Sequence, residues 1–285
     1  MIEIKLDAGL GNRMRALDSA LALGRAVGVP VRMIWTLGAD LNCPFEELFE
    51  PIPGMESFRN FRTEHDPILS SRRHILDFAR QLKPLVNVVR RAKAAKRAAH
   101  NITGTCKILG NDDVERLAQD RDALISLASK FDVRIDTFYR FFRGEADYVG
   151  FRPTAEIKER IDHFSLGEKN AVGVHIRTSD FDPYQTHGPL DKWVATLKSI
   201  HDADASVKFF VASNSQPVEE VLENELPTCI VRQKDKSYAR DDPEGVRHAL
   251  VDLYCLASCK RLLGSHHSSF TDTAREIGRI PCEIM

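Results

Sequence analysis

The second half of the chain alternates between short apolar segments and longer segments with helical periodicity. The apolar segments have the length of buried strands and cover residues 172–176, 207–212, 229–232 and 261–263. The segments with helical periodicity lie between them, at residues 190–201, 217–225 and 246–258. Strands that are each followed by a helix predict a parallel sheet with helices on both of its faces.

The first half opens with the same kind of unit. Its pattern predicts a strand at 2–6, a tight glycine loop at 9–13, a helix at 14–27 and a second strand at 30–35. Two further strands are predicted at residues 106–109 and 134–138. We therefore predict an α/β protein with two facing Rossmann-like domains, which cover residues 1–150 and 151–285.

Composition excludes several classes of protein. The chain has 285 residues, which is room for two domains of ordinary size or for one large domain. Its 40 Lys and Arg against 41 Asp and Glu give a net charge of -1. This balance argues against nucleic acid as the main partner. The six cysteines lack metal-site or disulfide spacing, and neither a signal region nor a membrane-spanning apolar run is present, so we expect a cytoplasmic protein.

Polar side chains follow three strands of the predicted C-terminal sheet. They are His175, Arg177 and Asp180 after the first strand, Ser213 and Asn214 after the second, and Ser265, Ser268 and Ser269 after the third. Ligands of open parallel sheets bind beyond the carboxyl ends of the strands. A guanidinium forms paired hydrogen bonds to phosphate, and serine hydroxyls with the N–H groups of a helix N-terminus complete such a shell. The combination predicts a nucleoside diphosphate site.

Each of these features alone has a plainer explanation. A serine cluster is commonly a helix cap, an arginine at a strand end a surface ion pair, and a histidine an ordinary polar contact. The convergence of three loops on one sheet edge favours a ligand. The glycine loop at residues 9–13 lacks the full G-x-G-x-x-G spacing, so it gives little support to a dinucleotide site.

Five segments of the chain resemble, in kind and order, motifs of the fucosyltransferase superfamily. They are Gly9-Leu-Gly-Asn-Arg13, His175-Ile-Arg177-Thr-Ser-Asp180, Ser213-Asn214, the stretch from Gly245 to Asp252, and Leu263-Gly-Ser265 with Ser268-Ser-Phe270. The superfamily includes bacterial nodulation-type and core α-1,6-fucosyltransferases and protein O-fucosyltransferases. The resemblance covers nearly the whole chain, with residues 55–130 least similar.

The resemblance implies a GT-B type glycosyltransferase architecture and the transfer of a sugar from a GDP-sugar donor. The family binds GDP-fucose mainly through the C-terminal domain and transfers fucose with inversion, without a required metal or other cofactor. Arg177 would hold the diphosphate, and Ser268 would bind the β-phosphate. His175 and Asp252 would contact the guanosine, with Ser213, Asn214 and Ser269 lining the same site. From the residue pattern alone, Asp252 would be an exposed position on a helix.

The acceptor side leaves alternatives open. Asp182, Asp180 and His187 are candidates for a general base that deprotonates a glycan or glycolipid hydroxyl, and Asp180 could instead position Arg177. Asn12 in the glycine loop offers a donor and an acceptor to a sugar hydroxyl. The chain has Thr178 where the family often has a second Arg, which leaves room for a different acceptor or GDP-sugar.

Two further interpretations stay open. A binding module that holds a GDP-sugar without turnover is the alternative to an enzyme. A basic stretch, formed by Arg90, Arg91, Lys93, Lys96 and Arg97, is expected to be a solvated helix face. Its alternative is a peripheral contact with the inner membrane or with an anionic lipid-linked acceptor.

Overall fold

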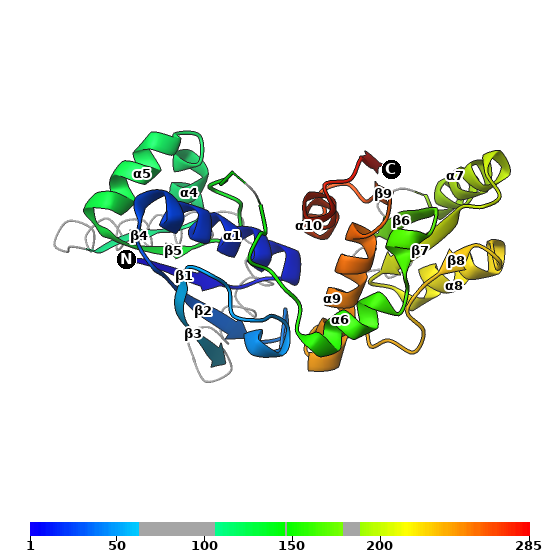
Figure 1. The fold of residues 1–285 in the computed structure, drawn as a ribbon, viewed down its shortest axis with the longest axis horizontal. Helices are drawn as coiled ribbons and strands as arrows, with labels where there is room; N and C mark the ends of the chain where they lie inside the picture. Colours follow the sequence, from blue (N-terminus) through cyan, green and yellow to red (C-terminus); the bar gives the residue numbers. More distant parts are fainter. Residues whose placement is uncertain (63–105, 146, 179–188) are drawn as a thin grey trace, which may run out of the picture. The chain divides into compact units, whose positions relative to one another are not determined.

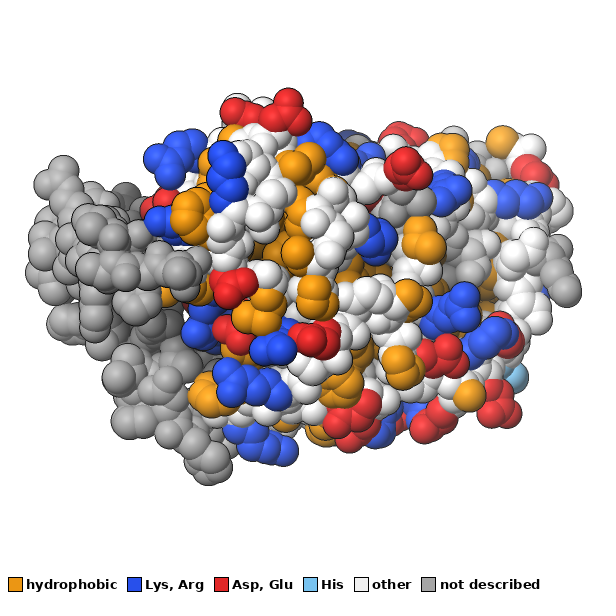
Figure 2. Space-filling model, turned by 60° about the vertical axis from the view of Figure 1, so that its left-hand side comes forward, with side chains coloured by type: hydrophobic (Ala, Val, Ile, Leu, Met, Phe, Trp, Pro, Cys, Tyr) orange, Lys and Arg blue, Asp and Glu red, His pale blue; other side chains and the backbone are white. Residues whose placement is uncertain are grey.

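The chain folds into two compact units. The computed structural model describes residues 1–62, 106–145, 147–178 and 189–285. Unit 1 comprises Met1–Phe45 and Pro51–Ala146, and unit 2 comprises Glu46–Glu50 and Asp147–Met285. Charged side chains of both signs are interspersed over the face seen in Figure 2, in keeping with the balanced composition.

Unit 1 is built on a five-stranded parallel sheet of order β3-β2-β1-β5-β4. Its strands are β1 (Ile2–Leu6), β2 (Val31–Leu37), β3 (Met55–Arg62), β4 (Cys106–Leu109) and β5 (Asp132–Asp136). Its helical elements among the described residues are α1 (Leu10–Val27), the 3-10 turn η1 (Phe45–Glu47, which continues into unit 2), α4 (Asn111–Leu117) and α5 (Arg121–Lys130). The alternation in β1 buries Ile2, Ile4 and Leu6 completely.

The glycine loop at residues 9–13 is shorter than its sequence predicts. Helix α1 begins at Leu10 instead of residue 14, with Gly9 as its extended N-cap residue. Ala8 takes up a left-handed conformation (φ +69°) and completes the turn between strand and helix. Gly11, Asn12 and Arg13 therefore lie in the first turn of the helix, because three residues, Asp7 to Gly9, suffice to connect β1 to α1.

Unit 2 is built on a second five-stranded parallel sheet, of order β10-β9-β6-β7-β8. Its strands are β6 (Ala171–Ile176), β7 (Lys208–Ser213), β8 (Ile230–Val231), β9 (Arg261–Gly264) and β10 (Cys282–Ile284). Its helical elements are α6 (Ala155–Asp162), the 3-10 turn η3 (Leu166–Glu168), α7 (Leu190–Ala203), α8 (Gln216–Glu225), α9 (Pro243–Ala257) and α10 (Ser269–Gly278). Two parallel sheets with helices beside them confirm the predicted α/β class.

Helices cover both faces of the sheet in unit 2. Figure 1 shows α6, α9 and α10 on one side of β6 and β7 and α7 with α8 on the other. Strand β6 is buried along its whole length, and Gly173 in it lets α9 approach closely, since a Cβ there would lie 3.1 Å from Leu256 Cδ2. The core on the α7 and α8 face includes Trp193 and Phe209. With both faces covered, a ligand reaches such a sheet at the ends of its strands.

The segment Glu46–Glu50 leaves unit 1 and pairs within unit 2. Glu50 donates its N–H to the Arg152 carbonyl (2.9 Å), and Thr154 donates to the Leu48 carbonyl (3.1 Å). Phe49 packs edge to face on Phe151, with 5.5 Å between the ring centroids. The sequence carries no recognisable signal for this exchange, because these pairings depend on contacts between segments about 100 residues apart.

Candidate functional site

Three loops meet at the carboxyl edge of the unit 2 sheet. Strand β6 lies between β9 and β7, so the loops that follow these strands are neighbours. The Ser265 hydroxyl accepts a hydrogen bond from the Arg177 N–H (2.8 Å) and donates one to the His175 carbonyl (3.1 Å). Asn214 Oδ1 accepts a hydrogen bond from the Thr178 N–H (2.8 Å). Side chains from two loops thus fix the backbone of the loop that carries Arg177.

The His175 ring is buried and neutral. Its Nδ1 lies 2.7 Å from the Thr271 hydroxyl, and the ring stacks on Phe270 at a centroid distance of 4.9 Å. Burial, reinforced by the positive charges of Arg177 and Lys236, lowers the pKa of His175 to about 3. The imidazole therefore acts as a hydrogen-bonding and stacking group near neutral pH rather than as a cation for phosphate.

The N-terminus of α10 lies at the same edge. Ser268 is its N-cap residue, and the hydroxyl accepts a hydrogen bond from the Thr271 N–H (3.4 Å). Ser269, the first residue of the helix, is partly exposed, and His267 before the cap takes a left-handed φ of +52° that turns the chain into the helix. The N–H groups and the dipole at a helix N-terminus favour anions.

Gly264 lets α10 pack against the end of β9. A Cβ at this position would lie 2.2 Å from Cγ2 of Thr271, the residue whose hydroxyl contacts His175. Thr271 is buried and β-branched, so it has little freedom to move aside. Glycine is therefore required here by close packing rather than by backbone conformation.

Asp252 of α9 is buried, contrary to the exposed position that its residue pattern indicates. It is 4% exposed, and each carboxylate oxygen already accepts one hydrogen bond. Oδ1 accepts from Gln233 Nε2 (2.6 Å), and Oδ2 accepts from Lys236 Nζ (2.8 Å). Both donors come from the segment between β8 and α9. The amphipathic pattern of α9 misses this burial because a neighbouring loop covers Asp252.

Lys236 joins Asp252 to a second buried carboxylate, that of Glu219 on α8. The ammonium group also donates to Glu219 Oε1 and lies 3.4 Å from the Ser213 carbonyl. Burial by itself would lower the pKa of Lys236, but the two carboxylates outweigh burial and the pKa lies above its ordinary value. For Glu219, burial dominates and raises the pKa. Sequence reasoning missed Lys236, Gln233 and Glu219.

Ser213 and Asn214, the two predicted site residues after β7, are engaged within the protein. The Ser213 hydroxyl accepts from the Ser215 N–H (3.1 Å), and the Ser213 N–H donates to Glu219 Oε1 (2.8 Å). Asn214 Oδ1 accepts its hydrogen bond from the Thr178 N–H. Both residues therefore shape the loop edge around Arg177.

In unit 1, Asn12 lies partly exposed in the first turn of α1, where the chain leaves β1. The adjacent Arg13 is buried and has a structural role. Its guanidinium donates to the Ala8 carbonyl (2.7 Å) and to the Thr36 carbonyl, and lies 4.8 Å from the Trp35 ring centroid. Arg13 thus ties the turn that carries Asn12 to β2.

Several predicted residues lie outside the described residues. They are Asp180, Asp182 and His187, and the basic stretch Arg90, Arg91, Lys93, Lys96 and Arg97. Among the residues that the structure describes, no three His, Cys, Asp or Glu side chains are grouped so that they could hold a metal ion. Within the same part of the chain, no helix is both long and apolar enough to cross a membrane.

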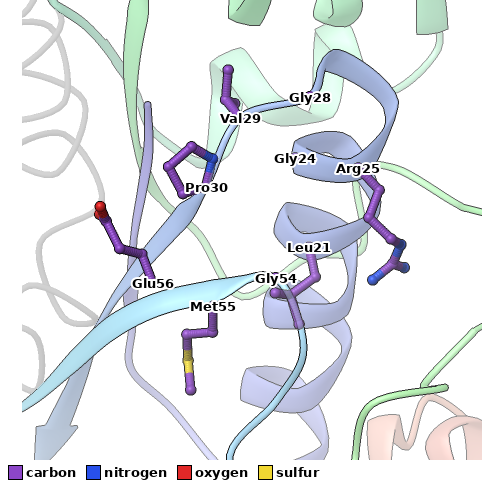
Figure 3. Close-up of a pocket in the computed structure, with 9 residues that line it drawn as sticks. All are labelled: Leu21, Gly24, Arg25, Gly28, Val29, Pro30, Gly54, Met55 and Glu56. Atoms are coloured by element: carbon purple, nitrogen blue, oxygen red, sulfur yellow. The ribbon is translucent and has the colours of Figure 1, made fainter.

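A cavity of about 380 Å³ in unit 1 lies away from the predicted residues (Figure 3). Its lining comes from the end of α1 and the starts of β2 and β3, and includes Leu21, Pro30 and Met55. Arg25 and Glu56 flank it, and in Figure 3 their side chains point away from one another. Ligands of parallel sheets bind at the opposite, carboxyl ends of the strands.

We expect Gly264→Ala to lower the free energy of unfolding by about 1–3 kcal/mol, because the new methyl group overlaps Thr271. Urea denaturation measures this change. Gly167→Ala is the matched control in the same unit, since a Cβ there meets nothing within 4 Å, and it should shift stability by less than about 0.5 kcal/mol. Equal stabilities of the two variants would contradict the close packing of α10 on β9.

Comparison with known proteins reveals similarity at the level of the fold. No protein-family model and no curated protein matches the sequence. Among solved structures, the fucosyltransferase NodZ from Bradyrhizobium is 19% identical, with 96% of this chain and 91% of that chain covered and a TM-score of 0.58. A mutant FUT1 of Arabidopsis thaliana in complex with GDP is 16% identical, with coverages of 99% and 69% and a TM-score of 0.60.

The likeness extends to a third enzyme, POFUT1 in complex with GDP-fucose. It is 12% identical, with 100% of this chain and 97% of that chain covered and a TM-score of 0.51. The chain therefore has the two-sheet GT-B fold of these fucosyltransferases.

Proposed function

We propose that the protein is a GDP-fucose-dependent fucosyltransferase that transfers fucose, with inversion, to a hydroxyl group of a glycan or glycolipid. The observation that carries the proposal is the edge of the unit 2 sheet, where Ser265 ties Arg177 and His175 beside the N-terminus of α10. The fold likeness to three fucosyltransferases supports it. No metal or other cofactor is required in this proposal.

The donor diphosphate binds Arg177 and the first turn of α10. Arg177 supplies a planar pair of charged donors, and Ser268 and Ser269 stand where the helix presents its free N–H groups. The guanosine contacts His175 and Asp252. A carboxylate accepts hydrogen bonds from guanine N1–H and the 2-amino group, whereas adenine offers no such pair of donors. This arrangement selects GDP over ADP.

The reaction is a direct displacement at the anomeric carbon of the donor. The bond to the GDP oxygen breaks as the acceptor oxygen attacks, and negative charge develops on the departing diphosphate. Arg177 and the α10 N-terminus stabilise that charge through fixed positive charge and dipoles. Asn12 orients a sugar hydroxyl, and Asp182 or His187 takes up the proton of the acceptor. Asp180 positions Arg177 in this scheme.

The first test combines binding with turnover. We expect GDP to raise the melting temperature of the protein more than ADP, UDP or CDP does, and GDP-fucose to be consumed in EDTA when an oligosaccharide acceptor is added. Thermal shift and release of GDP measure the two properties. GDP binding without turnover across acceptor classes would favour the binding module, and activity restored only by Mn²⁺ would contradict metal independence.

Arg177→Ala should weaken GDP binding by about 3 kcal/mol or more, the sum of two charge-assisted bonds at about 1.5 kcal/mol each. Arg177→Lys should recover little of the loss, because an ammonium group cannot replace the planar fork. Isothermal titration calorimetry measures both. Lys192→Ala removes an exposed charge on α7 and serves as the control. Wild-type affinity in Arg177→Lys would argue against a bidentate contact.

Asn12→Ala should lower the rate of transfer while the affinity for GDP stays within about twofold, because the proposed partner of Asn12 is a sugar hydroxyl rather than the nucleotide. Steady-state kinetics and a GDP titration give the two values. A loss of GDP affinity as large as that in Arg177→Ala would contradict the division of donor and acceptor contacts between the two units.

A further inference from the structure

The segment between β8 and α9 folds back over Asp252 and holds both of its oxygen atoms. Gln233 Nε2 donates to Oδ1 (2.6 Å) and also to the His248 carbonyl (2.8 Å), which fixes the amide against α9. Lys236 Nζ donates to Oδ2 (2.8 Å). The side chains of Lys236 and Asp252 are 3% and 6% exposed, so solvent competes little for these bonds. The carboxylate of Asp252 therefore has one defined orientation.

The position of this segment depends on a close approach of its backbone to the first turn of α9. A Cβ at Gly245, in the first turn of α9, would lie 2.0 Å from the Ala239 carbonyl oxygen. On the other side, the Tyr238 hydroxyl donates to Glu219 Oε2 (2.6 Å). The segment is thus pinned to both α8 and α9, and these contacts place Lys236 between Asp252 and Glu219.

We infer that Lys236 and Gln233 are positioning residues that orient the Asp252 carboxylate for two hydrogen bonds to guanine, and thereby set selectivity for guanine over hypoxanthine. The inference rests on the proposed function. It adds to that function the residues that make the base contact specific, and neither of them touches the base.

The count of lone pairs supports this assignment. An ionised carboxylate offers about four acceptor sites on its two oxygens. Gln233 and Lys236 use one site on each oxygen, which leaves one on each for a ligand. Guanine presents N1–H and the 2-amino group side by side, hypoxanthine keeps only N1–H, and adenine has an acceptor at N1. A fixed carboxylate therefore forms two bonds, one bond or none with the three bases.

The charges around Asp252 also support a positioning role for Lys236. The Lys236 ammonium group pairs with two buried carboxylates, those of Asp252 and Glu219, and Glu219 also lies 3.8 Å from Arg232 Nη1. Without Lys236, the carboxylates of Asp252 and Glu219 would repel each other in a site largely shielded from water, and Oδ2 of Asp252 would lose the donor that holds it. The field of Lys236 also reaches His175, the other residue assigned to the guanosine.

A role limited to stability is the competing explanation, because breaking a buried ion pair destabilises a protein whatever it binds. The two explanations differ in one quantity. A structural role changes the affinity for every nucleoside diphosphate by the same factor, whereas a positioning role changes the ratio of GDP affinity to IDP affinity. IDP differs from GDP only by the missing 2-amino group.

The test is the dissociation constants of GDP, IDP and ADP, measured by calorimetry for the wild type and four variants of the full chain. Lys236→Met and Gln233→Met remove the two donors, Lys236→Arg keeps the charge, and Lys234→Met removes an exposed lysine of the same segment as the control. We expect the wild type to prefer GDP over IDP by roughly 10- to 100-fold, the value of one hydrogen bond to a charged group.

In Lys236→Met the ratio of GDP affinity to IDP affinity should fall to within about threefold of unity. Lys236→Arg should keep most of the wild-type ratio, and Lys234→Met should keep all of it. Gln233→Met, which leaves both charges in place, should lower the ratio by about tenfold, and it decides the question if Lys236→Met does not fold. An unchanged ratio of GDP to IDP affinity in folded Gln233→Met or Lys236→Met would overturn the positioning role and leave the proposed function standing. A wild type that binds none of the three diphosphates would overturn the proposed function itself.

Discussion

The approach of α10 to the end of β9 determines the geometry of the whole candidate site. Thr271 in the first turn of α10 packs its methyl group where a side chain at Gly264 would lie, and it turns its hydroxyl to His175. Ser265, the residue after Gly264, then holds the backbone on both sides of Ile176. A helix N-terminus and an arginine are thereby brought to one sheet edge, a combination suited to a bound anion.

Charge is distributed unevenly around this edge. The imidazole of His175 is uncharged because burial disfavours its protonated form. The positive charge of Lys236 is matched by Asp252 and Glu219. The guanidinium of Arg177, half-buried at the end of β6, is the positive group to which the proposed function assigns the diphosphate, together with the α10 dipole. This separation fits a ligand with an anionic part and a neutral, hydrogen-bonding part.

The sequence predicts those features that depend on local pattern. The apolar run of β6 is a buried central strand, and the polar residues after β6, β7 and β9 converge because parallel strands bring their carboxyl ends to one edge. Features that depend on tertiary packing escape such reasoning. Lys236 lies in a polar, turn-rich segment whose composition indicates exposure, and only the fold of that segment over α8 and α9 buries it. Sequence reasoning also misses that α1 begins at Leu10, because the glycines in this segment favour a loop when the pattern is read by itself.

The buried network behind the site gives one further argument about its purpose. Burying charged groups is costly, and a protein in which well-packed apolar residues replace a buried ion pair is often as stable as the original or more stable. The protein nevertheless keeps an ammonium group, two carboxylates and an amide between α8 and α9. Asp252 is the member of this network whose remaining acceptor sites bear on the proposed base contact. If stability alone governed these positions, apolar residues would serve, so the network is better explained by what it presents to a ligand.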